Sequence, residues 1–304
     1  MPVSKKPRKS KAGAGTGSRK EASDIPALPD RRAMEGALSR FTAGFGSGPD
    51  DDALAHAQDL MYTAWETPDR RRRISLAEQA LRISPLCADA YVLLAEETAA
   101  TPEEAIELYR KGLEAGERAV GPAAFRNDVG HFWGLLETRP YMRARSGLAQ
   151  ALWMAGHRDE AIGHYRELLR LNPNDNQGNR YLLAACLLDL DRNEDLTALL
   201  DSYGREHSAE WSYTAALLDF RRGGDRPEAE ADLRQALTVN AHVPAYLLGR
   251  KKLPRGPAPY ITMGGEDEAQ EYVRRHAAAW TRTASAAEWL AKHIPDDKRT
   301  SRRR

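Results

Sequence analysis

Cysteine is scarce in this chain of 304 residues, which contains two, Cys87 and Cys186. Two cysteines cannot form the framework of several disulfides that stabilises many small secreted domains. Both lie among apolar residues in stretches of helical periodicity, where an unpaired thiol packs as a small hydrophobic group. We therefore expect buried free thiols and a cytoplasmic protein.

Long apolar runs are also missing. The longest one, YLLAACLL at residues 181–188, ends at Asp189 and is far shorter than the ~20 residues that a membrane-spanning helix needs. The N-terminal stretch MPVSKKPRKSKAGAGTGSRK is basic, but the apolar core of a signal peptide does not follow it. We expect no membrane partner.

Motifs for catalysis or ligand chemistry are absent as well. His157 and His164 lie seven residues apart, but no cysteine or acidic residue completes a metal-ligand set with them. The glycine-rich stretch GAGTGSRK at 13–20 lacks the Gly-Lys-Ser/Thr ending of a phosphate-binding loop and follows no strand. There is no Gly-x-Ser-x-Gly nucleophile motif. The sequence predicts a protein that is not an enzyme and uses no cofactor or metal ion.

A net charge near zero conceals two basic ends. The whole chain carries +1, residues 1–20 carry +7 and residues 297–304 carry +4, which leaves −10 for residues 21–296. We predict that residues 1–30 and 296–304 are disordered basic tails. Such tails attract nucleic acid through electrostatics that do not depend on sequence, although the acidic body opposes that binding.

Helical periodicity dominates from about residue 53 to residue 250, and the alternation typical of strands is not found. The clearest unit is RARSGLAQALWMAGHRDEAIGHYRELLRLNPND at 143–175, a predicted hairpin of two helices. Gly156 is placed to end the first helix, and Pro173 is placed to stop the second, since proline cannot donate a backbone hydrogen bond.

Copies of this hairpin recur along the chain. Ala161 aligns with Leu196 and then with Ala229, at steps of 35 and 33 residues. Two further copies are expected upstream, over 53–85 and 89–113. The period, with a small residue, a large one four positions later and a closing proline, resembles the tetratricopeptide repeat.

The predicted fold is therefore all-α, a tetratricopeptide-repeat α-solenoid in which about five helical hairpins form a right-handed superhelix. The repeats are expected over 31–243, beginning with a short helix over 31–42. A C-terminal cap segment is expected over 244–295, with a helix over 266–279 that covers the open end of the solenoid.

More specific motifs lie in the C-terminal third: NAHVPAYLLGRKKLP (240–254), EDEAQEYV (266–273) and AAAW (277–280). They resemble the end of the suppressor of tumorigenicity 7 family, and the similarity covers roughly 140–290. The resemblance implies a tetratricopeptide-repeat group without established catalytic activity, so it supplies no catalytic residue. Its animal members are membrane proteins, and this chain departs from them because it shows no spanning segment.

The stretch HFWGLLETRPYM at 131–142 does not follow the repeat period. It is either a binding loop or a piece of core between the upstream and downstream hairpins. We favour the core, because two exposed aromatics with two leucines would form an apolar patch that monomers seldom tolerate. The sequence does not decide whether 117–141 continues the superhelix.

In tetratricopeptide arrays the first helix of each repeat lines the concave surface. The repeat frame places seven candidate partner-binding residues there: Arg143, Gln150, Trp153, Tyr181, Trp211, Arg221 and Arg222. Aromatic rings contribute contact area and guanidinium groups bind carboxylates, although the aromatics can also serve packing between helices. The predicted function is a non-catalytic scaffold that binds a protein or peptide segment in this concave groove. The alternative is a nucleic-acid-associated accessory protein that acts through its basic tails.

Overall fold

A computed structural model describes residues 31–42, 49–204, 206–256, 258 and 260–294. Within these ranges every regular element is helical, namely α1 to α14 and the 3-10 turn η1 (Phe132–Gly134). The predicted basic tails lie outside the described residues. The short helix expected over 31–42 is confirmed as α1 (Arg31–Thr42).

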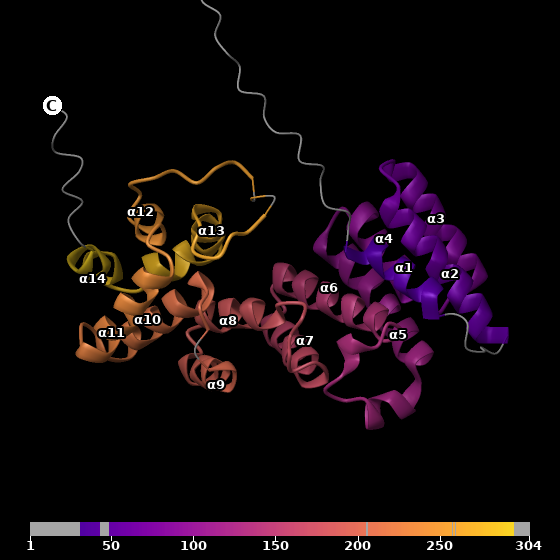
Figure 1. Cartoon of the computed structure of the whole chain (residues 1–304), viewed down its shortest axis with the longest axis horizontal. Helices are drawn as coiled ribbons and strands as arrows, with labels where there is room; N and C mark the ends of the chain where they lie inside the picture. The colour runs from indigo at the N-terminus through magenta and orange to yellow at the C-terminus, as the bar shows by residue number, and fades with distance from the viewer. Residues whose placement is uncertain (1–30, 43–48, 205, 257, 259, 295–304) are drawn as a thin grey trace, which may run out of the picture.

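Ten of the helices form five hairpins that lie side by side along the molecule (Figure 1). The pairs are α2 (Pro49–Glu66) with α3 (Arg70–Ile83), α4 (Ala88–Thr98) with α5 (Pro102–Asn127), α6 (Arg139–Ala155) with α7 (Arg158–Leu171), α8 (Asn179–Asp189) with α9 (Asn193–Tyr203), and α10 (Ala209–Gly223) with α11 (Pro227–Val239). Each of these helices packs against the next one along the chain. The all-helical solenoid of tetratricopeptide-like hairpins is confirmed.

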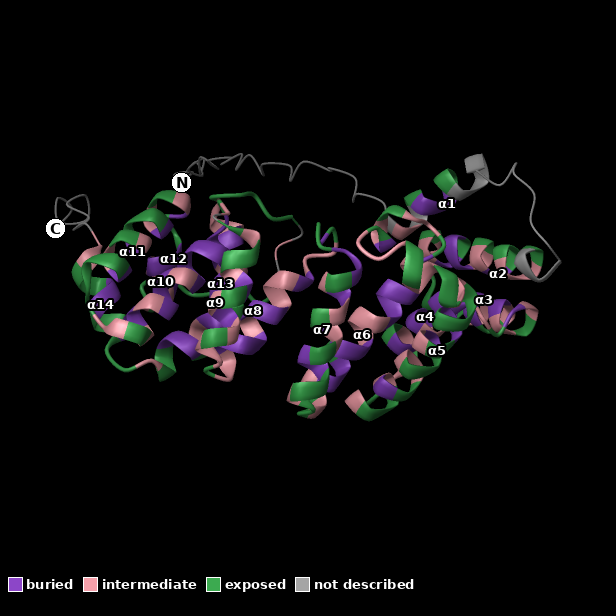
Figure 2. Ribbon diagram, turned by 90° about the horizontal axis from the view of Figure 1, so that it is seen from below, coloured by how far each residue is buried: buried purple, intermediate pink, exposed green. Residues whose placement is uncertain are grey.

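Both helices of the hairpin predicted at 143–175 end where the sequence predicts, whereas the first one begins earlier, at Arg139. Gly156 ends α6 in the left-handed region, with a φ of 89°, and α7 ends at Leu171, just before Asn172 and Pro173. The repeat-defining residues Ala161, Leu196 and Ala229 are all buried. Buried residues line the surfaces where neighbouring helices meet, as Figure 2 shows.

Helix α6 also approaches α5 closely. A Cβ atom on Gly147 would overlap the ring of Tyr109, which lies on α5. Glycine is therefore required by space at this position, because any larger residue would push the ring away or separate the two helices.

The segment between the upstream and downstream hairpins is packed core. Helix α5 bends at Gly121, whose φ is 74°, and Pro122, then continues to Asn127. The Phe132 ring is fully buried, with its centroid 5.1 Å from that of Phe125 and 6.1 Å from that of Tyr141. Because α5 also packs along α6, the upstream and downstream hairpins form one continuous array.

Three helices follow the last hairpin in the described residues: α12 (Val243–Leu247), α13 (Glu266–Arg282) and α14 (Ala286–His293). Helix α14 packs against α11, α12 and α13, and its Trp289 ring stacks on Phe220 at 4.4 Å between centroids. Helix α13 instead lies against α8 and α10, the first helices of the last two hairpins, as well as α12 (Figure 1). It thus covers a side of the array and not just its end.

A buried ion cluster joins α1, α4 and α6. The Arg143 guanidinium donates to both carboxylate oxygens of Asp89, over 2.8 and 2.6 Å, and to the Glu35 carboxylate over 2.8 Å. Asp89 is fully buried and Glu35 nearly so, so these charges have little access to water.

No helix of the described residues is long and apolar enough to cross a membrane.

Both cysteines should be inert toward thiol reagents in the folded protein. Burial raises the pKa of Cys87 and of Cys186 to about 12, and only the thiolate reacts. Labelling with Ellman's reagent near neutral pH should therefore be slow in buffer and rapid in guanidinium chloride that unfolds the chain. Rapid labelling of either cysteine in the native protein would contradict this burial.

The substitution Asp89→Ala should lower the free energy of unfolding by about 3–5 kcal/mol, because it leaves the Arg143 charge buried with one partner fewer. Urea denaturation followed by circular dichroism measures the change. Arg110→Ala is the matched control, since its 2.8 Å ion pair with Glu160 is exposed and should contribute under ~1 kcal/mol. Similar losses in the two variants would refute a buried cluster.

Gly147→Ala should destabilise the protein by roughly 1–3 kcal/mol through overlap with Tyr109. Gly163→Ala is the control, because Gly163 lies on α7 with open space around its Cβ position. There the better helix propensity of alanine should give no loss and up to about 1 kcal/mol of gain. Melting temperatures compare the two, and equal effects would show that the α5–α6 contact is looser than described.

Candidate functional site

The seven residues predicted to bind a partner lie in different surroundings. Arg143, Trp211 and the Arg221 side chain are buried in contacts within the chain, whereas Gln150 and Arg222 are exposed. Their surroundings differ because the repeat frame fixes which helix face a residue occupies, but not what packs over that face.

Arg221 on α10 forms hydrogen bonds with α8 and with the end of α13. It donates to the Leu188 carbonyl of α8 over 2.8 Å, and to the Thr283 hydroxyl and the Ala279 carbonyl at the end of α13 over 2.8 and 3.2 Å. Burial lowers its pKa, and the nearby Asp191 carboxylate, 3.0 Å away, opposes that shift. With these contacts in place, its guanidinium is oriented inward and does not face a groove.

On α6, Trp153 is half-buried beneath a cation. The Arg158 guanidinium lies 4.0 Å from the centroid of its ring and donates to the Trp153 carbonyl. Gln150 and Met154 occupy the same helix on its exposed side, and 74% of Met154 is exposed. This part of α6 therefore offers a small exposed surface that is separate from the other candidates.

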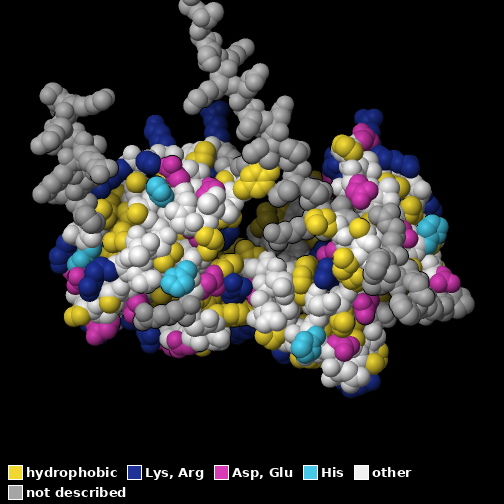
Figure 3. Space-filling model, in the orientation of Figure 1, with side chains coloured by type: hydrophobic (Ala, Val, Ile, Leu, Met, Phe, Trp, Pro, Cys, Tyr) yellow, Lys and Arg dark blue, Asp and Glu magenta, His cyan; other side chains and the backbone are white. Residues whose placement is uncertain are grey.

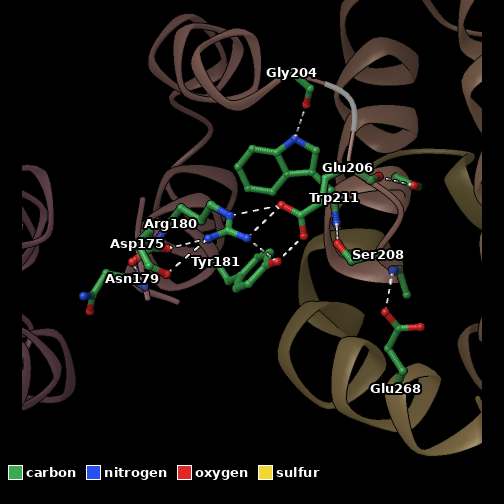
Figure 4. A network of polar contacts seen from close by, with 11 residues as sticks. Asp175, Asn179, Arg180, Tyr181, Gly204, Glu206, Ser208, Trp211 and Glu268 are labelled. Carbon is green, nitrogen blue, oxygen red and sulfur yellow. Dashed lines mark hydrogen bonds and ion pairs between the residues drawn. The ribbon is translucent and has the colours of Figure 1, made fainter. Parts of the chain in front are cut away.

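Tyr181 and Trp211 meet between α8 and α10 (Figure 4). Their rings are edge to face with centroids 5.9 Å apart, and Tyr203 packs on the indole in the same way at 6.0 Å. The indole nitrogen of Trp211 donates to the Gly204 carbonyl over 2.9 Å. This aromatic cluster fixes the loop that connects α9 to α10.

A charged network surrounds this cluster. Arg180 pairs with Asp175 and with Glu206, each over 3.0 Å, and the Tyr181 hydroxyl donates to Glu206 (Figure 4). Burial and the Glu206 carboxylate raise the pKa of Tyr181, so its hydroxyl stays protonated and continues to donate. Asp175 also accepts from the backbone nitrogen of Asn179 over 2.7 Å, which caps the start of α8.

A groove of about 540 Å³ lies directly beside this network. We call it the α9–α11 groove, and its lining is Thr197, Leu200, Asp201, Gly204, Glu206, His207, Trp211, Ser212, Ala215, Leu218, Asp219, Arg222, Asp232 and Gln235. Apolar side chains from α9 and α10 share the lining with charged ones. Arg222 donates to the Thr197 hydroxyl over 3.1 Å, so it links α10 to α9 across the groove.

The groove and α13 use different sides of α10. The α10 residues that contact α13 include Glu210, Tyr213 and Arg221, whereas the groove uses Ala215, Asp219 and others. Helix α13 lies on one side of α8 and α10, and α9 and α11 lie on the other (Figure 1). A related groove of about 420 Å³ lies one hairpin upstream, between α7 and α9.

The structure thus brings Trp211 and Arg222 into one groove, with Tyr181 behind Trp211. The sequence prediction missed the acidic lining residues Asp201 and Asp232. They belong to α9 and α11, and the repeat frame assigned binding to first helices alone. In the sequence, each of them is an acidic residue on the expected exposed side of the second helix of a hairpin. Acidic residues are common on exposed helix surfaces, so they do not indicate a binding site by themselves.

Comparisons with known proteins identify the family to which this sequence is similar. The family model for the suppressor of tumorigenicity 7 protein matches residues 47–295, which extends the resemblance beyond 140–290 to the upstream hairpins. The suppressor of tumorigenicity 7 proteins of Macaca fascicularis and Mus musculus are each 31% identical over 287 residues, covering 79% of this chain and 53% and 49% of theirs. The chain therefore spans about half the length of these relatives.

Among solved structures, "Crystal structure of YrrB: a TPR protein with an unusual peptide-binding site" aligns with 64% of this chain and 93% of its own. The sequence identity is 16% and the TM-score is 0.44. The family match covers most of the helical array described above, from α2 to α14. The chain belongs to the suppressor of tumorigenicity 7 protein family.

Proposed function

We propose that this chain is a non-catalytic, cytoplasmic protein-interaction scaffold that binds an extended protein segment in the α9–α11 groove. The observation that carries the proposal is the groove itself, a space of about 540 Å³ whose lining includes Trp211 and Arg222. Arrays of helical hairpins commonly present such extended surfaces to partners.

The composition of the groove suits a peptide. Leu200 is partly exposed and provides apolar surface for a side chain of a ligand, whereas Trp211 and Leu218, 3% and 2% exposed, form the floor of the groove. The charged side chains of Asp219 and Arg222 can pair with polar groups along its backbone and side chains. A preformed groove also reduces the ordering cost of binding, since the Arg180 network already holds the α9–α10 loop.

This proposal moves the binding surface away from the concave face predicted from the repeat frame. Helix α13 lies against α8 and α10 there, and Arg221 donates to its Ala279 carbonyl. The exposed side of α6 around Gln150 and Trp153 remains a proposed secondary contact. The nucleic-acid alternative depends on tails outside the described residues and stays a prediction.

Blocking the groove should abolish partner capture without unfolding the protein. Ala215→Trp places a large ring in the groove, and Ala278→Trp is the control because Ala278 is exposed on α13. We expect affinity capture with mass spectrometry to recover the same discrete proteins with wild type and the control. The groove variant should lose them, and Arg222→Ala should bind about tenfold more weakly.

Circular dichroism and melting temperature establish that each variant is folded. Capture that survives Ala215→Trp in a folded protein would rule out the groove. A different result would assign the function to the tails. In that case the capture recovers only nucleic acid, and this binding is lost at high salt and on deletion of residues 1–20.

A further inference from the structure

The loop between α12 and α13 combines features that the groove does not use. It exposes four large apolar side chains, Leu253 (37%), Tyr260 (44%), Ile261 (57%) and Met263 (60%). The rest of the described chain has three other exposed large hydrophobic residues, spread over two helices. Apolar side chains gathered on one exposed loop mark an interaction surface.

The same loop is strongly basic. Residues 249–265 contain Arg250, Lys251, Lys252 and Arg255 and no acidic residue, a net charge of +4. Since residues 21–296 together carry −10, the remainder of that segment carries −14. Lys and Arg side chains gather along the edge of the molecule that carries this loop, as Figure 3 shows. An acidic ligand is therefore attracted to this loop and repelled by most of the helical array.

Side chains of α13 hold the loop in place. Arg274 donates to the Gly256 carbonyl over 2.7 Å, and the Lys251 amine pairs with Glu266 over 2.5 Å. The Asp267 carboxylate accepts from the backbone nitrogen and the hydroxyl of Thr262, over 3.1 and 3.0 Å. These anchors fix both ends of the exposed stretch before any partner arrives.

The charge distribution favours a protein partner over a lipid surface. An anionic bilayer is an extended surface that would also face the rest of residues 21–296, whose charge of −14 it repels. A short acidic segment touches the loop alone, and a preformed surface lowers the entropy lost on binding it.

We infer that the α12–α13 loop is a docking surface for an acidic protein segment that also carries apolar side chains. Carboxylates of the ligand pair with Arg250, Lys252 and Arg255, and its apolar side chains cover Ile261 and Met263. The loop lies on the α13 side of the array, whereas the α9–α11 groove lies between the second helices (Figure 1). The scaffold can therefore hold two partners at once.

A selection of random 12-residue displayed peptides on the immobilised full chain tests this inference without assuming a ligand. Two variants alter the loop, Lys252→Glu with Arg255→Glu and Ile261→Ser with Met263→Ser. The controls are Arg71→Glu with Arg72→Glu on α3, and the exposed Met34→Ser on α1. We expect recovered peptides rich in Asp, Glu, Leu and Phe, whose affinity falls about tenfold or more in each loop variant and is unchanged in the controls.

Recovery of neutral or basic peptides, or equal affinity for wild type and the loop variants, would overturn the inference. Vesicles of phosphatidylcholine with phosphatidylserine form a second arm. Loop-dependent flotation with these vesicles, in the absence of acidic peptides from the selection, would also overturn it and assign the loop to lipid. The inference is independent of the groove, since Ala215→Trp should leave the selected peptides bound.

Discussion

Close packing of a large side chain against a small one sets the spacing of this array. Gly147 admits the ring of Tyr109 between α5 and α6, and buried Ala161 and Ala229 occupy the repeat position where helices meet. Ala161 recurs as Ala229, with Leu196 in the same position between them, at steps of 35 and 33 residues that match the tetratricopeptide period.

Helix α13 determines which surface of the array remains accessible. It buries Tyr272, Val273 and Trp280 against the last hairpins, so the chain supplies its own partner for a surface that other repeat arrays leave to ligands. The buried pair of His276 with Glu210 adds a polar contact between α13 and α10. The two proposed binding surfaces are consequently the groove on the opposite side and the loop that leads into α13.

Local signals predicted local structure well in this chain. Gly156 and Pro173 gave the ends of two helices, and the aromatic content of 131–142 indicated the core that Phe132 forms. Contacts between distant residues were not predictable. Arg143 was interpreted as a groove residue, but its partners Glu35 and Asp89 lie 108 and 54 residues away. No periodic pattern reports such pairings, because each depends on how several hairpins stack.

The separation of charge along the chain has a kinetic consequence. Residues 249–265 carry +4 and the rest of residues 21–296 carries −14, so the field of the molecule turns a charged partner before the surfaces touch. Orientation before contact raises the fraction of encounters that are productive, but only within the Debye length, about 8 Å at physiological ionic strength. For the two partners proposed above, the order of association then depends on the ionic conditions as well as on their affinities.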